Sequence, residues 1–205
     1  MNDINFDQIN LINLSVYSFI IDDIDNDQIY QDIVKFQKKL EPKSGFLSTE
    51  NDATYFASYE DGTFPKESKE CNKLKDKITA AVCSVLQKEM ILESIWSLIL
   101  KNGESVSVHS HKSNTHMYPN DYFSIAYYVK TPPGSAKLFF EAPYCNTIEN
   151  LISVEPKNGT LLIFNSFIKH FTERHLVNED RVVVSANFIP KQPNLKPIPD
   201  WSAYS

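Results

Sequence analysis

The histidines of this chain are confined to one stretch of the sequence. All five lie between positions 109 and 175, and three of them have the spacing of a metal site. His109 and His111 are separated by a single residue, so on a β-strand their side chains share one face. His170 lies much later, in a second β-rich run. Imidazole is the commonest transition-metal ligand, and two close histidines with one distant histidine leave coordination positions open for substrates. The pattern predicts a catalytic metal held by His109, His111 and His170.

A carboxylate is the alternative second ligand. A catalytic metal can also be held by two histidines and one carboxylate, and Asp121 is the reserve candidate, with Glu104 behind it. The i, i+2 geometry favours His111, because Asp121 reaches the metal only if the long intervening loop folds back. The simpler alternative is that the histidines are ordinary polar residues of the fold.

Short β-rich runs dominate the second half of the chain, and the three histidines lie within or next to these runs. About eight runs are expected, at residues 91–100, 106–109, 123–130, 137–141, 151–154, 160–164, 170–173 and 181–189. Turn residues separate them, notably Asn102-Gly103, Pro132-Pro133-Gly134 and Asn158-Gly159. In a barrel built from such strands, distant runs can meet, so residues around 109 and 170 can share one site.

The first part of the chain has a different pattern. Residues 11–21 suggest a strand, and helices are predicted from Asp25 or Asn26 to about residue 40 and over residues 67–90. Two helices followed by about eight strands predict a mainly β fold with a helical annex: a double-stranded β-helix (jelly roll) with two N-terminal helices packed outside. We expect a single domain over 1–205, comprising 1–92, a β core at 93–189 and an extended tail at 190–205.

Composition narrows the possible partners. The chain has 205 residues, a formal charge of −6 and three widely spaced cysteines. The negative charge disfavours nucleic acid, and the cysteine count suits neither a disulfide framework nor a zinc knuckle. The acidic N-terminus is unlike a signal peptide, and no apolar run approaches the ~20 residues of a membrane span. We therefore expect a cytoplasmic protein that binds neither nucleic acid nor membrane. A small-molecule or peptide substrate and a homodimer are separate expectations, which composition does not decide.

Motifs on both sides of the histidines carry a family resemblance. Downstream, Gly159 leads a strand that ends in Phe164, His170 follows, and eleven residues later Arg181 opens a strand containing Ser185 and Asn187. Upstream, the order is Trp96, Gly103, His109-Ser-His111 and then Tyr127-Tyr128. Over roughly residues 94 to 189 this resembles the Fe(II)/2-oxoglutarate dioxygenases, and more narrowly a small 2OG-Fe(II) oxygenase family of marine bacteria and their phages.

The resemblance implies cofactors and further site residues. It implies Fe(II), 2-oxoglutarate and O₂, with succinate and CO₂ released as the substrate is hydroxylated or desaturated. Arg181 would anchor the far carboxylate of 2-oxoglutarate, since a guanidinium fork matches a carboxylate with two parallel hydrogen bonds. Ser185 and Tyr127 (or Tyr128) could add hydroxyl donors, and Arg174 is the reserve cation. Halogenases of this superfamily keep the second ligand position small, so His111 argues against halogenation.

Two rival functions remain open. Gly103 followed by His109-x-His111 also matches the opening of a cupin motif, although the glutamate and the second motif expected of cupins are missing. Such a protein could be a 2-oxoglutarate-independent dioxygenase or an isomerase. The other rival is a non-catalytic jelly-roll binding domain. The primary substrate is not encoded in any motif, but an aromatic pocket is expected, built from Tyr118, Tyr122, Phe123, Phe139 and Phe140.

Overall fold

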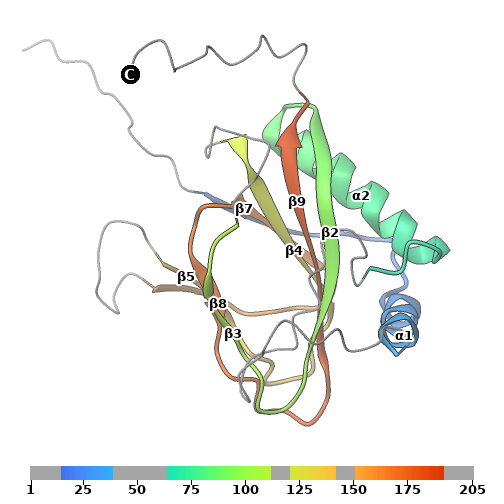
Figure 1. The fold of residues 1–205 in the computed structure, drawn as a ribbon, viewed down its shortest axis with the longest axis vertical. Coiled ribbons are helices and arrows are strands. Elements are labelled where there is room, and N and C mark those ends of the chain that lie inside the picture. The colour runs from blue at the N-terminus through green and yellow to red at the C-terminus, as the bar shows by residue number, and fades with distance from the viewer. Residues whose placement is uncertain (1–14, 39–63, 112–120, 142–150, 192–205) are drawn as a thin grey trace, which may run out of the picture.

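Two antiparallel sheets and two helices make up the computed structural model (Figure 1), which describes residues 15–38, 64–111, 121–141 and 151–191. The helices are α1 (Asn26–Gln37) and α2 (Lys69–Leu86). The strands are β1 (Val16–Ile20), β2 (Met90–Leu100), β3 (Val106–His109), β4 (Phe123–Lys130), β5 (Leu138–Glu141), β6 (Leu151–Val154), β7 (Thr160–Asn165), β8 (His170–Thr172) and β9 (Arg181–Pro190). The predicted mainly β fold with two N-terminal helices is confirmed.

Polar caps begin both helices. The side chain of Asp25 accepts a hydrogen bond from the Gln28 amide, and the side chain of Ser68 accepts one from the Cys71 amide. These caps satisfy amide groups that have no partner within the helix. The second helix is shorter than predicted, because Gln87 adopts a left-handed conformation with φ 50° and the chain turns into β2 at Met90.

The larger sheet has the strand order β1-β7-β4-β9-β2, and the smaller has the order β3-β8-β5-β6. Both helices pack on the outer face of the larger sheet, where Ile29, Ile33, Leu74 and Ile78 join one hydrophobic core. A second core lies between the sheets and includes Tyr128, Leu138, Phe140, Phe164 and Val183. The central strands are therefore covered on both faces, which explains why their sequences are almost continuously apolar.

Strand alternation assigns each side chain of β4 and β9 to one of these two cores. Ser124, Ala126 and Tyr128 share the inner face of β4, whereas Ile125, Tyr127 and Val129 belong to the core under the helices. On β9, Arg181 begins an inner row that continues at every second residue through Asn187. The inner faces of β4 and β9 thus bring polar side chains into the space between the sheets.

Some predicted elements fall on undescribed residues. The start of the predicted strand at 11–21, the end of the first predicted helix, the loop after His111 and the predicted tail beyond residue 191 all lie outside the described residues. No helix within the described ranges is both long and apolar enough to cross a membrane.

Candidate metal centre

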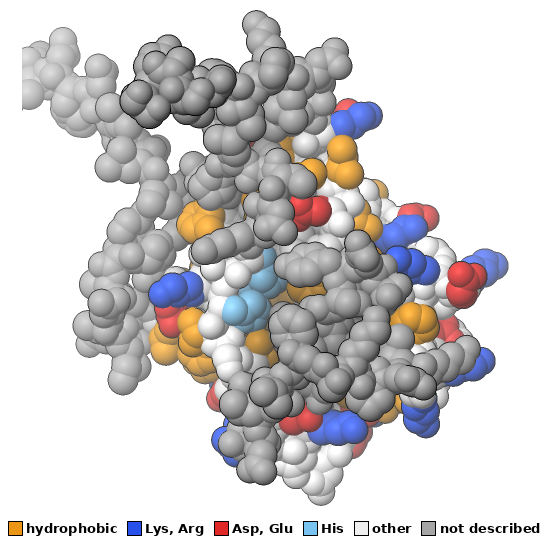
Figure 2. Space-filling model, viewed as in Figure 1, with side chains coloured by type: hydrophobic (Ala, Val, Ile, Leu, Met, Phe, Trp, Pro, Cys, Tyr) orange, Lys and Arg blue, Asp and Glu red, His pale blue; other side chains and the backbone are white. Residues whose placement is uncertain are grey.

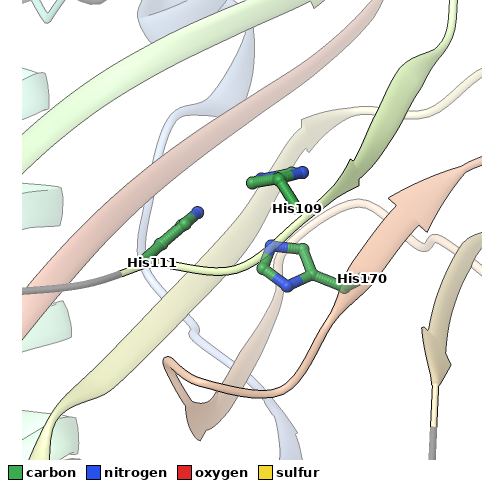
Figure 3. Close-up of side chains that lie close together, drawn as sticks. All are labelled: His109, His111 and His170. Atoms are coloured by element: carbon green, nitrogen blue, oxygen red, sulfur yellow. The ribbon is translucent and has the colours of Figure 1, made fainter.

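Three histidines from two strand ends converge in the space between the sheets (Figure 3). His109, the last residue of β3, is paired in register with His170, the first residue of β8. His111 lies just beyond the end of β3, where its backbone amide donates to the Ser166 carbonyl at 2.8 Å. Potential ligand atoms of all three rings lie within 4.8 Å of one another. One metal ion can therefore contact all three imidazoles.

Hydrogen bonds at Nδ1 select which ring nitrogen each histidine offers to a metal. His109 Nδ1 donates to the Ser107 carbonyl at 2.8 Å, and His170 Nδ1 donates to the Ile168 carbonyl at 2.9 Å. Carbonyl oxygens only accept hydrogen bonds, so both rings carry their proton on Nδ1 and keep the Nε2 lone pair for a ligand role. For His111, Nε2 is buried and has no hydrogen-bond partner in the described structure. An orphaned nitrogen at this position fits a metal ligand.

Burial keeps the three rings neutral. Burial, together with the neighbouring His109 and His111, lowers the pKa of His170 to about 3. Burial also lowers the pKa of His111 to about 4, and it shifts the pKa of His109 downward. Because a metal ion competes with protons for imidazole nitrogen, rings that are already neutral are ready to bind one.

The lowered pKa values make the metal-free fold sensitive to acid. Unfolded histidines take up protons near pH 6.5, whereas folded His111 and His170 resist protonation until about pH 4 and about pH 3. Unfolding therefore takes up protons in this window, and the free energy of unfolding falls as the pH drops below 6.5. A pKa difference of one unit corresponds to about 1.4 kcal/mol. At about pH 4.5 we therefore expect each of the two rings to lower the free energy of unfolding by roughly 2 to 3 kcal/mol.

Urea unfolding of the metal-free protein at neutral and acid pH measures this loss. His170→Gln should remove one ring's share of the acid-dependent destabilisation. An equal pH dependence for the variant and the wild type would contradict the assignment of a depressed pKa to His170.

The candidate carboxylates lie apart from this cluster. Asp121 forms an ion pair with Lys88 at 2.7 Å, and a Glu104 side-chain oxygen accepts from the Lys101 amide at 2.8 Å. Within the described part of the chain, the group of histidines, cysteines and carboxylates that can hold a metal consists of the three histidines alone. The described residues therefore favour His111 over Asp121 and Glu104 as the second ligand.

A cavity adjoins the histidines and leads to a buried cation. Its walls are mostly apolar and aromatic, and they are formed by Trp96, Leu98, Val106, Ile125, Ala126, Tyr128, Leu138, Phe164, Phe171, Thr172, Arg181, Val183 and Ser185 together with the three histidines. Histidine side chains, coloured pale blue, are visible at the molecular surface in Figure 2. No described residue that lines this cavity is a carboxylate.

Arg181 is the charged side chain among the described residues that line this cavity. It is only 2% exposed, its guanidinium lies 5.2 Å from the centre of the Tyr128 ring, and its Nε has no hydrogen-bond partner in the described structure. Burial lowers the pKa of Arg181, but an arginine remains protonated at neutral pH. The Tyr128 hydroxyl is also buried without a partner among the described residues. A buried cation whose Nε lacks a hydrogen-bond partner, beside a buried hydroxyl, fits an anionic ligand.

Two sequence-based assignments need correction. Tyr127 belongs to the core beneath the helices, and its hydroxyl donates to Asn26 Oδ1 at 2.8 Å. Tyr127 therefore faces away from the cavity, and its neighbour Tyr128 faces into it. Of the aromatic residues expected in the pocket, Tyr122, Phe123, Phe139 and Phe140 do not line it, and Tyr118 lies outside the described residues. The aromatic walls are Trp96, Tyr128, Phe164 and Phe171.

The other predicted residues are placed as follows. Ser185 lines the cavity with Arg181, whereas the reserve cation Arg174 is exposed to solvent. His175 is fully buried away from the cluster; its Nε2 donates to the Glu179 carbonyl and its Nδ1 accepts from the Ala136 amide. His175 is thus a structural histidine. His116 lies outside the described residues.

Comparisons with known proteins agree with this geometry. Residues 94–187 match the model of a family described as "Putative 2OG-Fe(II) oxygenase", which confirms the resemblance expected for residues 94 to 189. No curated protein sequence matches the chain significantly.

Solved structures show the same fold at low sequence identity. HygX from Streptomyces hygroscopicus, solved with nickel and 2-oxoglutarate bound, has a TM-score of 0.57 and 15% identity over 87% of this chain and 83% of its own. The non-haem monooxygenase ThoJ, solved as a nickel complex, has a TM-score of 0.56 and 14% identity over 85% of this chain and 73% of its own. AviO1 from Streptomyces viridochromogenes Tue57 has a TM-score of 0.51 and 10% identity; the alignment covers 64% of this chain and 66% of AviO1.

Proposed function

We propose that this chain, whose residues 94–187 match a 2OG-Fe(II) oxygenase family, is a non-haem Fe(II)/2-oxoglutarate-dependent dioxygenase. The observation that carries the proposal is the juxtaposition of three neutral histidines with a buried arginine in one cavity. The proposed substrate is a small molecule or a peptidyl group, and the proposed reaction is hydroxylation or desaturation. We also propose that the two sheets form a double-stranded β-helix within a single domain.

His109, His111 and His170 are the proposed iron ligands. Their Nε2 atoms would supply three nitrogen donors, and a transition metal held by three protein ligands keeps positions open for substrates. With Fe(II) bound, the site would supply O₂ activation coupled to oxidative decarboxylation of 2-oxoglutarate to succinate and CO₂. The protein contributes ligand geometry, orientation and a largely apolar cavity. His111 fills the ligand position that a halide would need, so we propose oxygenation rather than halogenation.

Arg181 is the proposed anchor for the far carboxylate of 2-oxoglutarate. The cosubstrate is a dianion, and Arg181 is a buried cation without a carboxylate among the described residues that line the cavity. A guanidinium can give a carboxylate two parallel hydrogen bonds. Tyr128, rather than Tyr127, supplies the nearby phenol, and Ser185 supplies a further hydroxyl. HygX, which shares the fold, was solved with nickel and 2-oxoglutarate bound, and this supports a site that holds a metal together with 2-oxoglutarate.

Turnover of 2-oxoglutarate tests the proposed function. Purified protein given Fe(II), ascorbate, O₂ and 2-oxoglutarate should slowly form succinate even without its primary substrate, and a chelator should stop the reaction. Stoichiometric metal without succinate formation would favour the cupin-type rival. Absence of any stoichiometric metal, in protein purified without a histidine tag, would favour a non-catalytic binding domain.

Paired variants test the identity of the second ligand. Asp121→Ala should leave iron affinity unchanged, because Asp121 is paired with Lys88 and lies apart from the histidine cluster. His111→Ala should weaken iron binding and uncouple or abolish succinate formation. Equilibrium dialysis with Fe(II) under anaerobic conditions compares the two. If only the Asp121 variant lost iron, the ligands would be two histidines and the Asp121 carboxylate rather than three histidines.

A further inference from the structure

Behind His111, a buried row of polar side chains crosses the larger sheet. Asn187 on β9 is paired in register with Ser124 on β4 and with Ser94 on β2. Ser124 and Asn187 are 0% and 2% exposed, and Ser166, at the end of β7, is 0% exposed. Polar groups buried this deeply destabilise a fold unless they are hydrogen-bonded, so their hydrogen bonds are informative.

The hydrogen bonds orient the Asn187 amide. Its Nδ2 donates to Ser94 Oγ at 3.1 Å, which leaves its Oδ1 facing the other way. Oδ1 then accepts from Ser124 Oγ at 2.8 Å, while Ser124 Oγ also lies 2.7 Å from Ser166 Oγ. None of these four side chains has a buried polar atom left without a partner. The row is therefore a satisfied network in which Asn187 presents an acceptor toward His111.

The ring of His111 is hydrogen-bonded by side chains of this row. Its Nδ1 lies 2.8 Å from Asn187 Oδ1 and 2.8 Å from Ser124 Oγ. An amide oxygen only accepts, so the ring must carry its proton on Nδ1. The Nε2 atom, buried and without a partner among the described residues, is then left with its lone pair. His109 and His170 obtain the same tautomer from backbone carbonyls, which no side-chain substitution can remove.

We propose that Asn187 is the positioning residue of the metal centre: its Oδ1 selects the Nδ1–H tautomer of His111 and holds the ring so that Nε2 completes the three-histidine site. The metal part of this inference rests on the proposed function, whereas the tautomer of His111 does not. Outer hydrogen-bond partners of this kind typically change metal affinity by about 10–100-fold.

Three variants of the full chain separate positioning from general destabilisation. Asn187→Leu removes the acceptor at similar volume and should weaken Ni(II) binding by roughly 10–100-fold. Asn187→Asp keeps an acceptor toward Nδ1, and it should bind Ni(II) at least as tightly as the wild type. Ser94→Ala removes the acceptor of the Asn187 Nδ2 group but leaves Asn187 Oδ1 in place. It is therefore the matched control for a general disturbance of the polar row, and it should keep the Ni(II) affinity of the wild type.

Nitrogen NMR of the imidazoles in metal-free protein gives a readout that does not depend on metal or on catalysis. The wild type should show His111 as the Nδ1–H tautomer, and Asn187→Leu should shift it toward Nε2–H or a mixture. A wild-type His111 protonated on Nε2 would overturn the inference, as would Asn187→Leu with an unchanged tautomer and unchanged Ni(II) affinity. A wild type that shows the Nδ1–H tautomer but binds no metal would instead reject the proposed function.

Discussion

His170→Ala should abolish both iron binding and succinate formation. His170 is paired with His109 across β3 and β8, it is 5% exposed, and its ring nitrogens belong to the three-histidine cluster. Removing one of three ligands leaves two neutral nitrogens, so the affinity should fall by more than the roughly 10–100-fold that loss of an outer hydrogen-bond partner costs. Metal content after anaerobic reconstitution and succinate yield measure the two effects.

His175→Gln is the matched control for this experiment. His175 is also a buried histidine of the same region, but both of its ring nitrogens are engaged by the protein backbone. The control variant should lose stability while retaining iron in whatever fraction remains folded. If His170→Ala bound iron as tightly as the wild type, His170 would not be a ligand.

Arg181→Leu should raise the Michaelis constant for 2-oxoglutarate by about 100-fold with little change in metal content. The expected size follows from a hydrogen bond to a charged group, which contributes about 1.5–3 kcal/mol, where 1.4 kcal/mol corresponds to a factor of ten. Arg181 lines the cavity but is not part of the three-histidine cluster. The substitution should therefore change the Michaelis constant for 2-oxoglutarate without changing the metal content. Steady-state succinate formation at varied 2-oxoglutarate gives the constant.

Arg174→Leu provides the comparison. Arg174 is the nearby arginine in sequence, but it is exposed and does not line the cavity. Its removal should leave the Michaelis constant unchanged. The reverse outcome, a large effect at Arg174 and none at Arg181, would move the carboxylate anchor out of the cavity.

Much of the fold could be predicted because local signals and tertiary packing agree. The turns at Gly103, Gly134 and Gly159 separate strands as expected, and all three glycines adopt positive φ values. Every β-rich run predicted after residue 90 is a strand, with ends shifted by one residue at most. The end of α2 was less predictable, because apolar spacing continues through Met90 while Gln87 already leaves the helix.

The site was predictable only in part, because sequence gives spacing along strands but not pairing between them. Periodicity placed Tyr127 and Tyr128 on opposite faces of one strand without showing which face lies toward the histidine cluster. The helices pack against the face that carries Tyr127, and this packing depends on tertiary structure that periodicity does not reveal. The alternation of side chains along β9 places Asn187 on the same face as Arg181 and Ser185, so its inward direction could be predicted. Its contact with His111 could not, because that contact depends on the register between β4 and β9.

Anaerobic titration of the protein with Fe(II) and 2-oxoglutarate tests the central claim most directly. Chelation of a protein-bound ferrous ion by 2-oxoglutarate gives a visible metal-to-ligand charge-transfer band, so the account predicts this band at one iron and one 2-oxoglutarate per chain. The band should be absent in His170→Ala, and in Arg181→Leu it should need far more 2-oxoglutarate. Tight iron binding without such a band at saturating 2-oxoglutarate would contradict the assignment of this cavity as a 2-oxoglutarate site.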